Sequence, residues 1–182
     1  VNGYYDLNSD QIEQETGWDS DDYVNIWVVN NFFGKEIAGF ANLANFSGFT
    51  GNNIQNGIRI ESEYLNTIAL IHEMGHFLGL YHTFEEGESG SCPSNGDCTT
   101  DGDRVCDTDP HVQDASCGSL SEESNNLCTG NAFGKVLRNF MAYGSYYCKD
   151  IFTVGQNERM NAALEVSNRK SLLESHGLTP AT

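Results

Sequence analysis

Three histidines and a glutamate lie close together in the stretch His72-Glu73-Met-Gly-His76-Phe-Leu-Gly79-Leu-Tyr-His82. Residues four apart on a helix lie one turn above each other on the same face, so His72 and His76 can share one tetrahedral metal ion. Glu73 points about 100° away from His72 around the helix, where it can reach a water bound to that metal. We therefore predict a zinc site with Glu73 as the base.

Gly79 and His82 extend this motif. A glycine at position 79 can adopt the left-handed conformation that ends a helix and turns the chain, which lets His82 return as a third ligand. Three ligands leave the fourth position of the metal open, as in catalytic zinc sites. The chain has 5 histidines, so the alternative, histidines without a metal, requires their clustering here to be a coincidence.

The extended motif resembles that of the metzincin metallopeptidases, in which a turn containing methionine follows the third histidine. The segment Asn139-Phe-Met141-Ala-Tyr143 is similar to that turn. Within the metzincins, the chain is most similar to the pappalysin family, especially to its cytophagalysin-like bacterial and archaeal members. The similarity covers about residues 22 to 165, and it rests on His82-Thr-Phe, Asp107-Thr-Asp-Pro110, the methionine turn, Cys148, and Phe152-Thr-Val-Gly-Gln156 before a last helix.

This resemblance implies an α/β (α+β) fold of the metzincin type. We expect a twisted, mostly parallel sheet with an antiparallel edge strand, and a buried active-site helix above the cleft. A loop-rich, disulfide-linked lower half should end in a C-terminal helix. We expect residues 1–182 to form a single metallopeptidase catalytic domain, with an upper subdomain at about 1–79 and a lower one at about 80–182.

The resemblance also implies a function: a secreted zinc-dependent endopeptidase that hydrolyses extended protein substrates, with Glu73 as general base. Tyr143 is expected to be catalytic by donating to the developing oxyanion, although packing in the core is the alternative role for a tyrosine. Met141 is expected to form an apolar floor under the metal, and Gly79 to support the site.

One stretch departs from the family pattern. Pappalysin-like enzymes that prefer basic residues carry an acidic group a few residues beyond the methionine, whereas this chain reads Gly144-Ser-Tyr146-Tyr-Cys148. With Tyr146 in the pocket, an apolar or aromatic preference is at least as plausible as a basic one. Asp150 is the alternative acidic group if the loop bends back.

All 6 cysteines lie between positions 92 and 148, which predicts disulfides and an oxidising, extracellular compartment. The alternative is a second zinc site that includes His111, but the sequence has no Cys-x-x-Cys pair. Six cysteines allow fifteen pairings, so spacing alone leaves the pairing open. The family resemblance implies Cys92 with Cys128 and Cys117 with Cys148, which leaves Cys98 with Cys106.

The segment from Glu85 to Asp114 is rich in carboxylates, and Arg104 is its one basic residue. Closely spaced carboxylates repel each other unless water or a hard cation such as calcium lies between them. We therefore predict structural calcium, an expectation that the resemblance supports, and the alternative is a solvated acidic loop. The candidate ligands are Glu86, Asp103, Asp107, Thr108 and Asp109.

Strands are predicted at 23–32, inside the sheet, at 37–44 and at 57–64. We expect the second strand to be the sheet edge that binds an extended peptide through Gly39, Phe40, Ala41 and Asn42, unless it is an ordinary edge strand. The active-site helix is predicted to begin at an Asn66 N-cap and to end near Leu78. The pattern Thr153-Val-Gly-Gln156 predicts a capping box at the start of the last helix.

The formal net charge is −17, which argues against nucleic-acid and membrane partners. The chain opens Val1-Asn-Gly-Tyr without the features of a signal peptide, so we expect a processed form whose signal peptide and pro-segment precede this sequence. The expected partners are protein or peptide substrates, and we expect a monomer.

Two other functions fit part of the pattern. An inactive, metal-stabilised binding module would keep the fold but would be expected to lose Glu73, which is present. A zinc hydrolase of a non-peptide amide or ester would use the same metal chemistry without an edge strand for the substrate. Substrate screening separates these alternatives.

Overall fold

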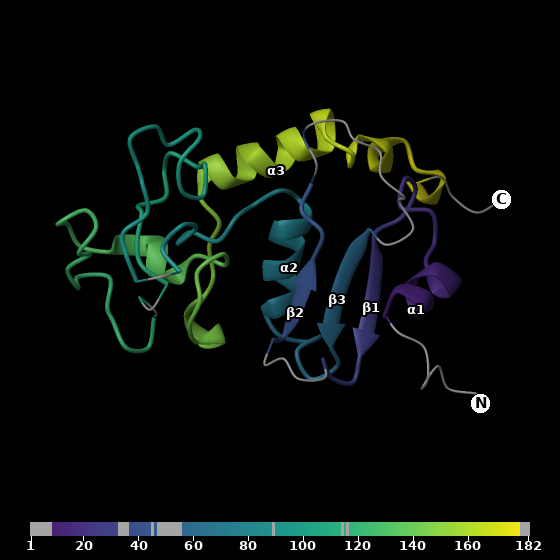
Figure 1. The fold of residues 1–182 in the computed structure, drawn as a ribbon, viewed down its shortest axis with the longest axis horizontal. Helices are drawn as coiled ribbons and strands as arrows, with labels where there is room; N and C mark the ends of the chain where they lie inside the picture. Colours follow the sequence, from purple (N-terminus) through teal and green to yellow (C-terminus); the bar gives the residue numbers. More distant parts are fainter. Residues whose placement is uncertain are drawn as a thin grey trace.

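The structure is a computed structural model that describes residues 9–32, 37–44, 46, 56–88, 90–113, 115 and 117–178. A sheet and the helix α2 (Ala69–Phe77) form one half of the molecule, and loops joined by disulfides form the other (Figure 1). The helix α3 (Val154–Val166) runs along one side of both halves, and α1 (Ser9–Thr16) lies near the first strand. None of the described helices combines the length and the apolar character that crossing a membrane requires.

The described sheet has three strands: β1 (Asn25–Val29), β2 (Gly39–Ala41) and β3 (Gly57–Glu61), in the order β1-β3-β2. β1 pairs with β3 in parallel, and β2 pairs with β3 antiparallel. This arrangement confirms the predicted mixed sheet with an antiparallel edge strand. The prediction for 23–32 was wrong in one respect, because β3 and not β1 lies at the centre of the described sheet.

The two faces of β3 differ because side chains alternate along a strand. Ile58 and Ile60 are fully buried on the face toward α2. Arg59 lies on the opposite face, where it forms a buried ion pair with Glu13 of α1 and lies 4.8 Å from the Trp27 ring centroid. This pairing compensates a charge that would otherwise be costly to bury, and it anchors α1 to the sheet.

The beginning of α2 differs from the prediction. The N-cap position is Ile68 and has no side-chain capping bond, because residues 62–67 form turns before the helix starts. The Thr67 hydroxyl accepts from the Ala69 N–H (3.1 Å) and partly replaces the missing cap. The end of the helix agrees with the prediction: Gly79 has φ +89°, and a Cβ there would lie 2.9 Å from the Phe46 ring.

α3 begins with the predicted capping box. The Thr153 hydroxyl accepts from the Gln156 N–H (3.1 Å), and the Gln156 side chain accepts from the Thr153 N–H (2.9 Å). Asp107 adds a second cap, since its Oδ2 accepts from the Gly155 N–H (2.9 Å). Gln156 also bonds Asn139 in both directions (2.7 and 3.1 Å), so the start of α3 is fixed to the segment before Met141.

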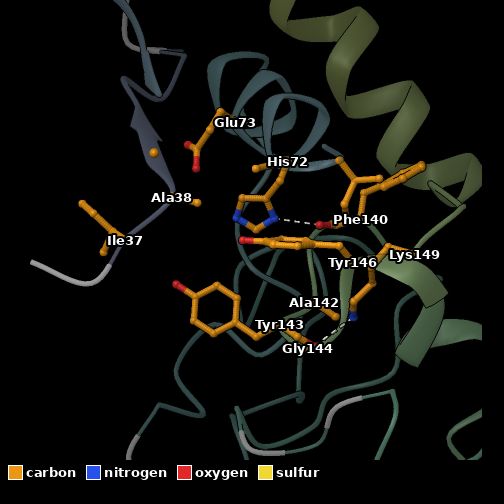
Figure 2. A pocket seen from close by; sticks show the side chains of 13 residues that line it. Ile37, Ala38, His72, Glu73, Phe140, Ala142, Tyr143, Gly144, Tyr146 and Lys149 are labelled. Atoms are coloured by element: carbon orange, nitrogen blue, oxygen red, sulfur yellow. Dashed lines mark hydrogen bonds between the residues drawn. The ribbon is translucent and has the colours of Figure 1, made fainter. Parts of the chain in front are cut away.

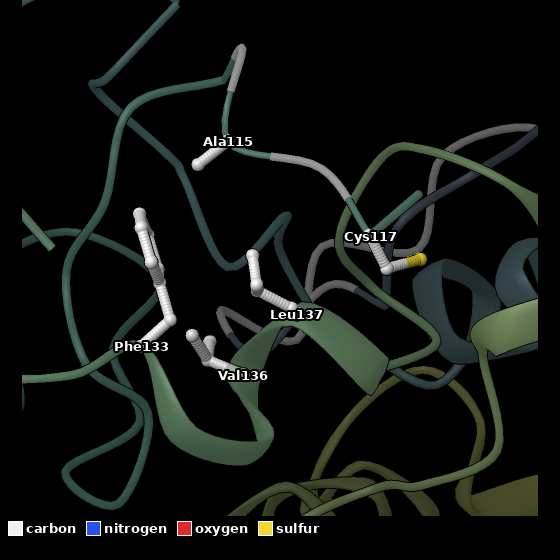
Figure 3. Close-up of a cluster of buried hydrophobic side chains, with 5 residues drawn as sticks. All are labelled: Ala115, Cys117, Phe133, Val136 and Leu137. Carbon is white, nitrogen blue, oxygen red and sulfur yellow. The ribbon is translucent and has the colours of Figure 1, made fainter. Parts of the chain in front are cut away.

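The second half of the molecule depends on covalent links and a small core. The disulfides are Cys92–Cys128, Cys98–Cys106 and Cys117–Cys148, which are the pairs that the family resemblance implies. Because no cysteine is free, the alternative of a second zinc site on these cysteines is wrong. The core beside them, shown in Figure 3, consists of Ala115, Cys117, Phe133, Val136 and Leu137.

Short 3₁₀ helices complete the fold: η2 (Gly134–Arg138), η3 (Tyr146–Cys148), η4 (Lys170–Glu174) and η5 (His176–Leu178). The last two bring the chain back to the sheet half. Arg169, which is fully buried, donates from Nε to the Phe77 carbonyl (3.0 Å) and from Nη2 to the Asn42 carbonyl (2.7 Å). The C-terminal segment therefore supports both α2 and the chain after β2.

Candidate active site

The three histidines of the motif converge. α2 carries His72 and His76 on one face, and the turn at Gly79 brings His82 back toward them. The Nε2 atom of His76 lies 3.1 Å from Nε2 of His72 and 3.1 Å from Nε2 of His82. Within the described part of the chain, this is the one group of three or more His, Cys, Asp or Glu residues whose ligand atoms lie within 4.8 Å of one another.

Hydrogen bonds fix the tautomers of two of these rings. Nδ1 of His72 lies 2.7 Å from the Phe140 carbonyl, and Nδ1 of His76 lies 2.8 Å from the Leu80 carbonyl. A carbonyl can only accept, so Nδ1 carries the proton in both rings and Nε2 presents a lone pair. Lone pairs that face each other at 3.1 Å repel unless a cation lies between them, so the arrangement fits a bound metal ion.

Burial keeps these histidines neutral. It lowers the pKa of His72 to about 4, with a further contribution from His76, and it also lowers the pKa values of His76 and His82. A neutral imidazole is the form that binds a metal. Three imidazole nitrogens with an open position are the donor set of a catalytic zinc site, so the residues present fit zinc.

Glu73 lies beside the triad on α2 and faces β2. Its side chain is nearly buried, and its Oε2 atom has no hydrogen-bond partner among the described residues. Burial raises the pKa of Glu73 to about 7. A carboxyl group with such a pKa can take up and release a proton near neutral pH.

Met141 and Tyr143 lie on the other side of the histidines. Met141 is fully buried, and its sulfur packs so closely against Gly75 of α2 that the glycine leaves no room for a Cβ. The Tyr143 ring is 43% exposed and lies 4.8 Å from the His82 ring and 4.7 Å from the Phe84 ring. Tyr143 is therefore only half packed, and Figure 2 shows its hydroxyl directed into the cavity.

A cavity of about 450 Å³ opens beside His72 and Glu73 (Figure 2). Three segments line it: the chain leading into β2, the first turns of α2, and the chain that follows Phe140. Its lining residues are Ile37, Ala38, Gly39, Ile68, Ala69, His72, Glu73, Phe140, Ala142, Tyr143, Gly144, Tyr146 and Lys149.

The predicted substrate strand meets this cavity only in part. Gly39 lines it, as does Tyr146. The Phe40 side chain points to the opposite face of the sheet, where its ring centroid lies 5.3 Å from the Arg59 guanidinium. Asn42 uses its side chain to accept from the Gly57 N–H (3.1 Å). Phe40 and Asn42 therefore do not direct their side chains at a substrate in this cavity.

Lys149 is a lining residue that the sequence analysis missed. Its side chain is buried, and Nζ donates to the carbonyls of Leu137 (2.8 Å) and Tyr143 (2.9 Å). Burial lowers the pKa of Lys149 to about 8. The only signal in the sequence was a lysine directly after Cys148, in the segment where the family motif departs, and nothing in its spacing points inward.

Asp150 is not an acidic substitute in the pocket. Its Oδ1 atom accepts from Nε of Arg138 (3.0 Å) on the exposed surface, and it does not line the cavity. The alternative in which Asp150 bends back toward the substrate is therefore wrong.

The five candidate calcium ligands are not gathered at one point. Asp103 and Thr108 are together: Oδ2 of Asp103 accepts from the Thr108 hydroxyl (2.7 Å), and burial raises the pKa of Asp103 to about 7. Asp107 instead caps α3, while Glu86 and Asp109 are exposed. A cavity of only about 10 Å³ adjoins Asp103 and Thr108, with Asp101, Ser94 and Thr83 around it.

Comparison with known proteins assigns the family. The Peptidase_M43 family, described as pregnancy-associated plasma protein-A, matches residues 6–165. The chain belongs to this family. An extracellular metalloprotease of the fungus Verticillium alfalfae is 36% identical over 91 residues, which are 50% of this chain and 28% of the fungal protein. Human pappalysin-1 is 33% identical over 106 residues, 56% of this chain and 6% of pappalysin-1.

Solved structures agree with this assignment at the level of the fold. Mature mirolysin of Tannerella forsythia, in complex with a cleaved peptide, superposes with a TM-score of 0.70 at 24% identity, over 96% of this chain and 68% of mirolysin. Mirolysin in complex with a compound named compound 9 gives a TM-score of 0.73 at 22% identity, over 96% of this chain and 68% of that chain. The chain spans less than a third of the length of the curated relatives it matches.

Proposed function

We propose that this chain is a secreted zinc endopeptidase in which His72, His76 and His82 hold the metal and Glu73 is the general base. The observation that carries the proposal is the convergence of three neutral imidazole nitrogens beside a buried carboxyl group, next to a cavity that His72 and Glu73 line. Membership of a metallopeptidase family supports it. The disulfides and the relatives named extracellular metalloproteases support secretion.

Zinc in this site supplies a Lewis acid that makes water more acidic and polarises a carbonyl. Glu73 takes the proton of the attacking water and then returns this proton to the leaving amine. Tyr143 donates its hydroxyl proton in a hydrogen bond to the oxygen on which negative charge develops. Met141 packs against Gly75 of α2 and so holds in place the helix that carries His72 and His76.

An extended peptide can bind along β2. The Ala38 carbonyl accepts from the Glu61 N–H (2.9 Å), and the Asn42 N–H donates to the Gly57 carbonyl (3.2 Å), so these residues direct their backbone groups toward β3. Because backbone groups alternate along a strand, those of Gly39 and Ala41 face outward. No described strand pairs with that edge. A substrate strand added there would run past Glu73.

The chain acts as one monomeric domain, with its cleft between an upper part at about 1–79 and a lower part at about 80–182.

Structural calcium binds near Asp103 and Thr108, where buried oxygen atoms gather around a small cavity. The test for calcium is the melting temperature of a chelated, zinc-reloaded sample: calcium should raise it, and an unchanged value would contradict the site.

Mass spectrometry of a diverse peptide library tests the enzyme activity. The zinc-loaded wild-type chain should cut internal peptide bonds, whereas Glu73→Ala should retain zinc and cut nothing. Activity of Glu73→Ala within tenfold of wild type would refute its role as base. If neither protein cuts a peptide, the chain is a binding module or acts on a non-peptide amide or ester, and a screen of small amides and esters decides between them.

A further inference from the structure

The floor of the cavity beside His72 is formed by a buried ammonium group. Lys149 reaches the cavity from the end of η3, and Figure 2 shows its side chain extending below Tyr146 toward the backbone of Ala142 and Gly144. The whole residue is 5% exposed. A lysine at such a position is unusual, because lysines are almost never fully buried without a partner.

Two carbonyl groups hold this ammonium group in place. Nζ donates to the Leu137 carbonyl, near the end of η2, and to the Tyr143 carbonyl, at the end of the methionine turn. An ammonium group has three N–H donors. Two are used, and among the described residues no acceptor takes the third, while the side chain borders the open cavity. Lys149 is thus preorganised to meet one more acceptor.

Among the described residues, no carboxylate forms an ion pair with Lys149. Glu73 is the one carboxylic acid among the residues that line the cavity, and it lies across the cavity on α2. Asp150, the acidic neighbour in sequence, is paired with Arg138 on the surface. In the part of the chain that the structure describes, two carbonyl dipoles solvate the ammonium group and no carboxylate pairs with it, so a carboxylate brought by a ligand could serve as its counterion.

We propose that Lys149 makes this cavity a pocket for an acidic side chain, so that the enzyme prefers an aspartate or a glutamate next to the scissile bond. This inference rests on the proposed peptidase function, and it names the class of substrate. The carboxylate would accept the third N–H of Lys149. The cavity adjoins His72 and Glu73, so its occupant belongs to a residue that flanks the cleaved bond.

A basic side chain would be unfavourable in the same pocket. The Lys149 ammonium would repel it, the Phe140 and Ala142 side chains offer it no acceptor, and Asp150 is outside. The net charge of −17 acts in the other direction, since it repels acidic peptides at long range. The preference should therefore be clearest in peptides whose other positions are neutral or basic, and in moderate salt, which screens the long-range field.

The test uses peptides that differ only in the residue next to the scissile bond. The peptide library first identifies which side of the bond the cavity reads, and kcat/KM is then measured for glutamate, glutamine and lysine at that position. Glutamine has the shape of glutamate without its charge. We expect wild type to favour glutamate over glutamine by about tenfold or more, as for a hydrogen bond to a charged group, and to cut the lysine peptide least.

Two variants test whether Lys149 causes the preference for glutamate. In Lys149→Met the ratio of glutamate to glutamine should fall to about one, and in Lys170→Met, which removes an exposed lysine and the same charge, it should stay at the wild-type value. A glutamate preference that survives in a folded Lys149→Met variant overturns the proposal. Thermal melting checks that the variant folds, and if it does not, the wild-type peptide series decides alone.

The same measurements distinguish a failure of the acidic pocket from a failure of the peptidase function. If wild type cuts peptides that Glu73→Ala leaves intact but shows no preference for glutamate over glutamine, only the acidic pocket is overturned. If wild type cuts no peptide at all, the proposed peptidase function fails, and the pocket assignment fails with it.

Discussion

Single hydrogen bonds fix the tautomers of two of the three histidines. The carbonyls of Phe140 and Leu80 hold the protons of two histidines on Nδ1, which turns the Nε2 lone pairs toward each other. Glu73 differs from the histidines, because no hydrogen bond holds its Oε2 atom among the described residues. Burial raises the pKa of Glu73 to about 7. The histidines are thus prepared to bind a cation, and Glu73 to exchange a proton.

Tyr143→Phe tests the proposed oxyanion contact. Removing the hydroxyl should lower kcat by about tenfold to a hundredfold with little change in KM, since a donor to the transition state contributes at most about a thousandfold. Because the ring and its contacts with His82 and Phe84 remain, the zinc content and the melting temperature should stay at wild-type values. A variant with wild-type kcat would leave Tyr143 with a packing role only.

The sequence predicted the groups whose positions depend on local geometry. The spacing of His72 and His76 on a helix and the need for glycine at 79 follow from helical periodicity and from φ at one residue. Lys149 could not be predicted in this way. Its direction depends on carbonyls of Leu137 and Tyr143, which only the folded chain brings to Nζ. For the same reason the sequence did not show that the Phe40 side chain leaves the cleft.

At the scale of elements, a chain of contacts connects the acidic loop, α3 and the methionine turn. Asp107 accepts from the Gly155 N–H, Gln156 bonds Asn139, and Oδ1 of Asn139 accepts from the Met141 N–H (2.9 Å). The N-terminus of α3 therefore helps to hold Met141 beneath α2. Asp107, which the sequence analysis assigned to calcium, has both carboxylate oxygens occupied by α3 in this arrangement.

Asp107→Ala tests the capping role. The change removes two acceptors from the start of α3 and should lower the free energy of unfolding by about 1–2 kcal/mol, the cost of losing an N-cap together with a favourable charge at a helix N-terminus. Chemical denaturation without calcium measures it. Asp109→Ala, at an exposed position two residues away, is the control and should change stability little. An equal loss in both variants would contradict the capping role.

The boundaries of elements were predictable where capping chemistry decides them. The capping box at Thr153 and the glycine at 79 set the start of α3 and the end of α2 as predicted. The Asn66 N-cap prediction was wrong, because residues 62–67 form turns between β3 and α2 and the helix begins only after them. The choice between a cap and a turn there depends on where β3 ends in the sheet, which local sequence does not contain.

The whole molecule combines two kinds of stabilisation. The sheet half has a buried apolar face on β3 and α2, whereas all three disulfides lie in the half built from loops. The C-terminal segment closes the molecule, as Arg169 contacts backbone after β2 and at the end of α2. The mixed sheet and the family fold could be predicted from the sequence. The central place of β3 could not, because strand order depends on contacts between distant segments.

Removal of single disulfides should distinguish their contributions. A cross-link that closes a longer loop restricts the unfolded chain more, and Cys92–Cys128 spans 36 residues while Cys98–Cys106 spans 8. By the loop-entropy estimate these contribute about 4 and about 2.5 kcal/mol. In denaturant unfolding, replacing both cysteines of Cys92–Cys128 by serine should therefore destabilise the protein by about 1.5 kcal/mol more than the same change at Cys98–Cys106. Equal losses of stability, or a larger loss for Cys98–Cys106, would show that contacts in the native state, and not the entropy of the unfolded chain, determine what each disulfide contributes.

Anomalous X-ray diffraction at the zinc absorption edge, from crystals of the zinc-loaded chain, tests the central claim most directly. We expect one strong peak about 2.0–2.1 Å from Nε2 of each of His72, His76 and His82, with the Glu73 carboxyl group nearby but outside the metal's coordination sphere. A peak at other residues, or no peak between the three histidines in zinc-loaded crystals, would contradict the proposed metal centre and the mechanism built on it.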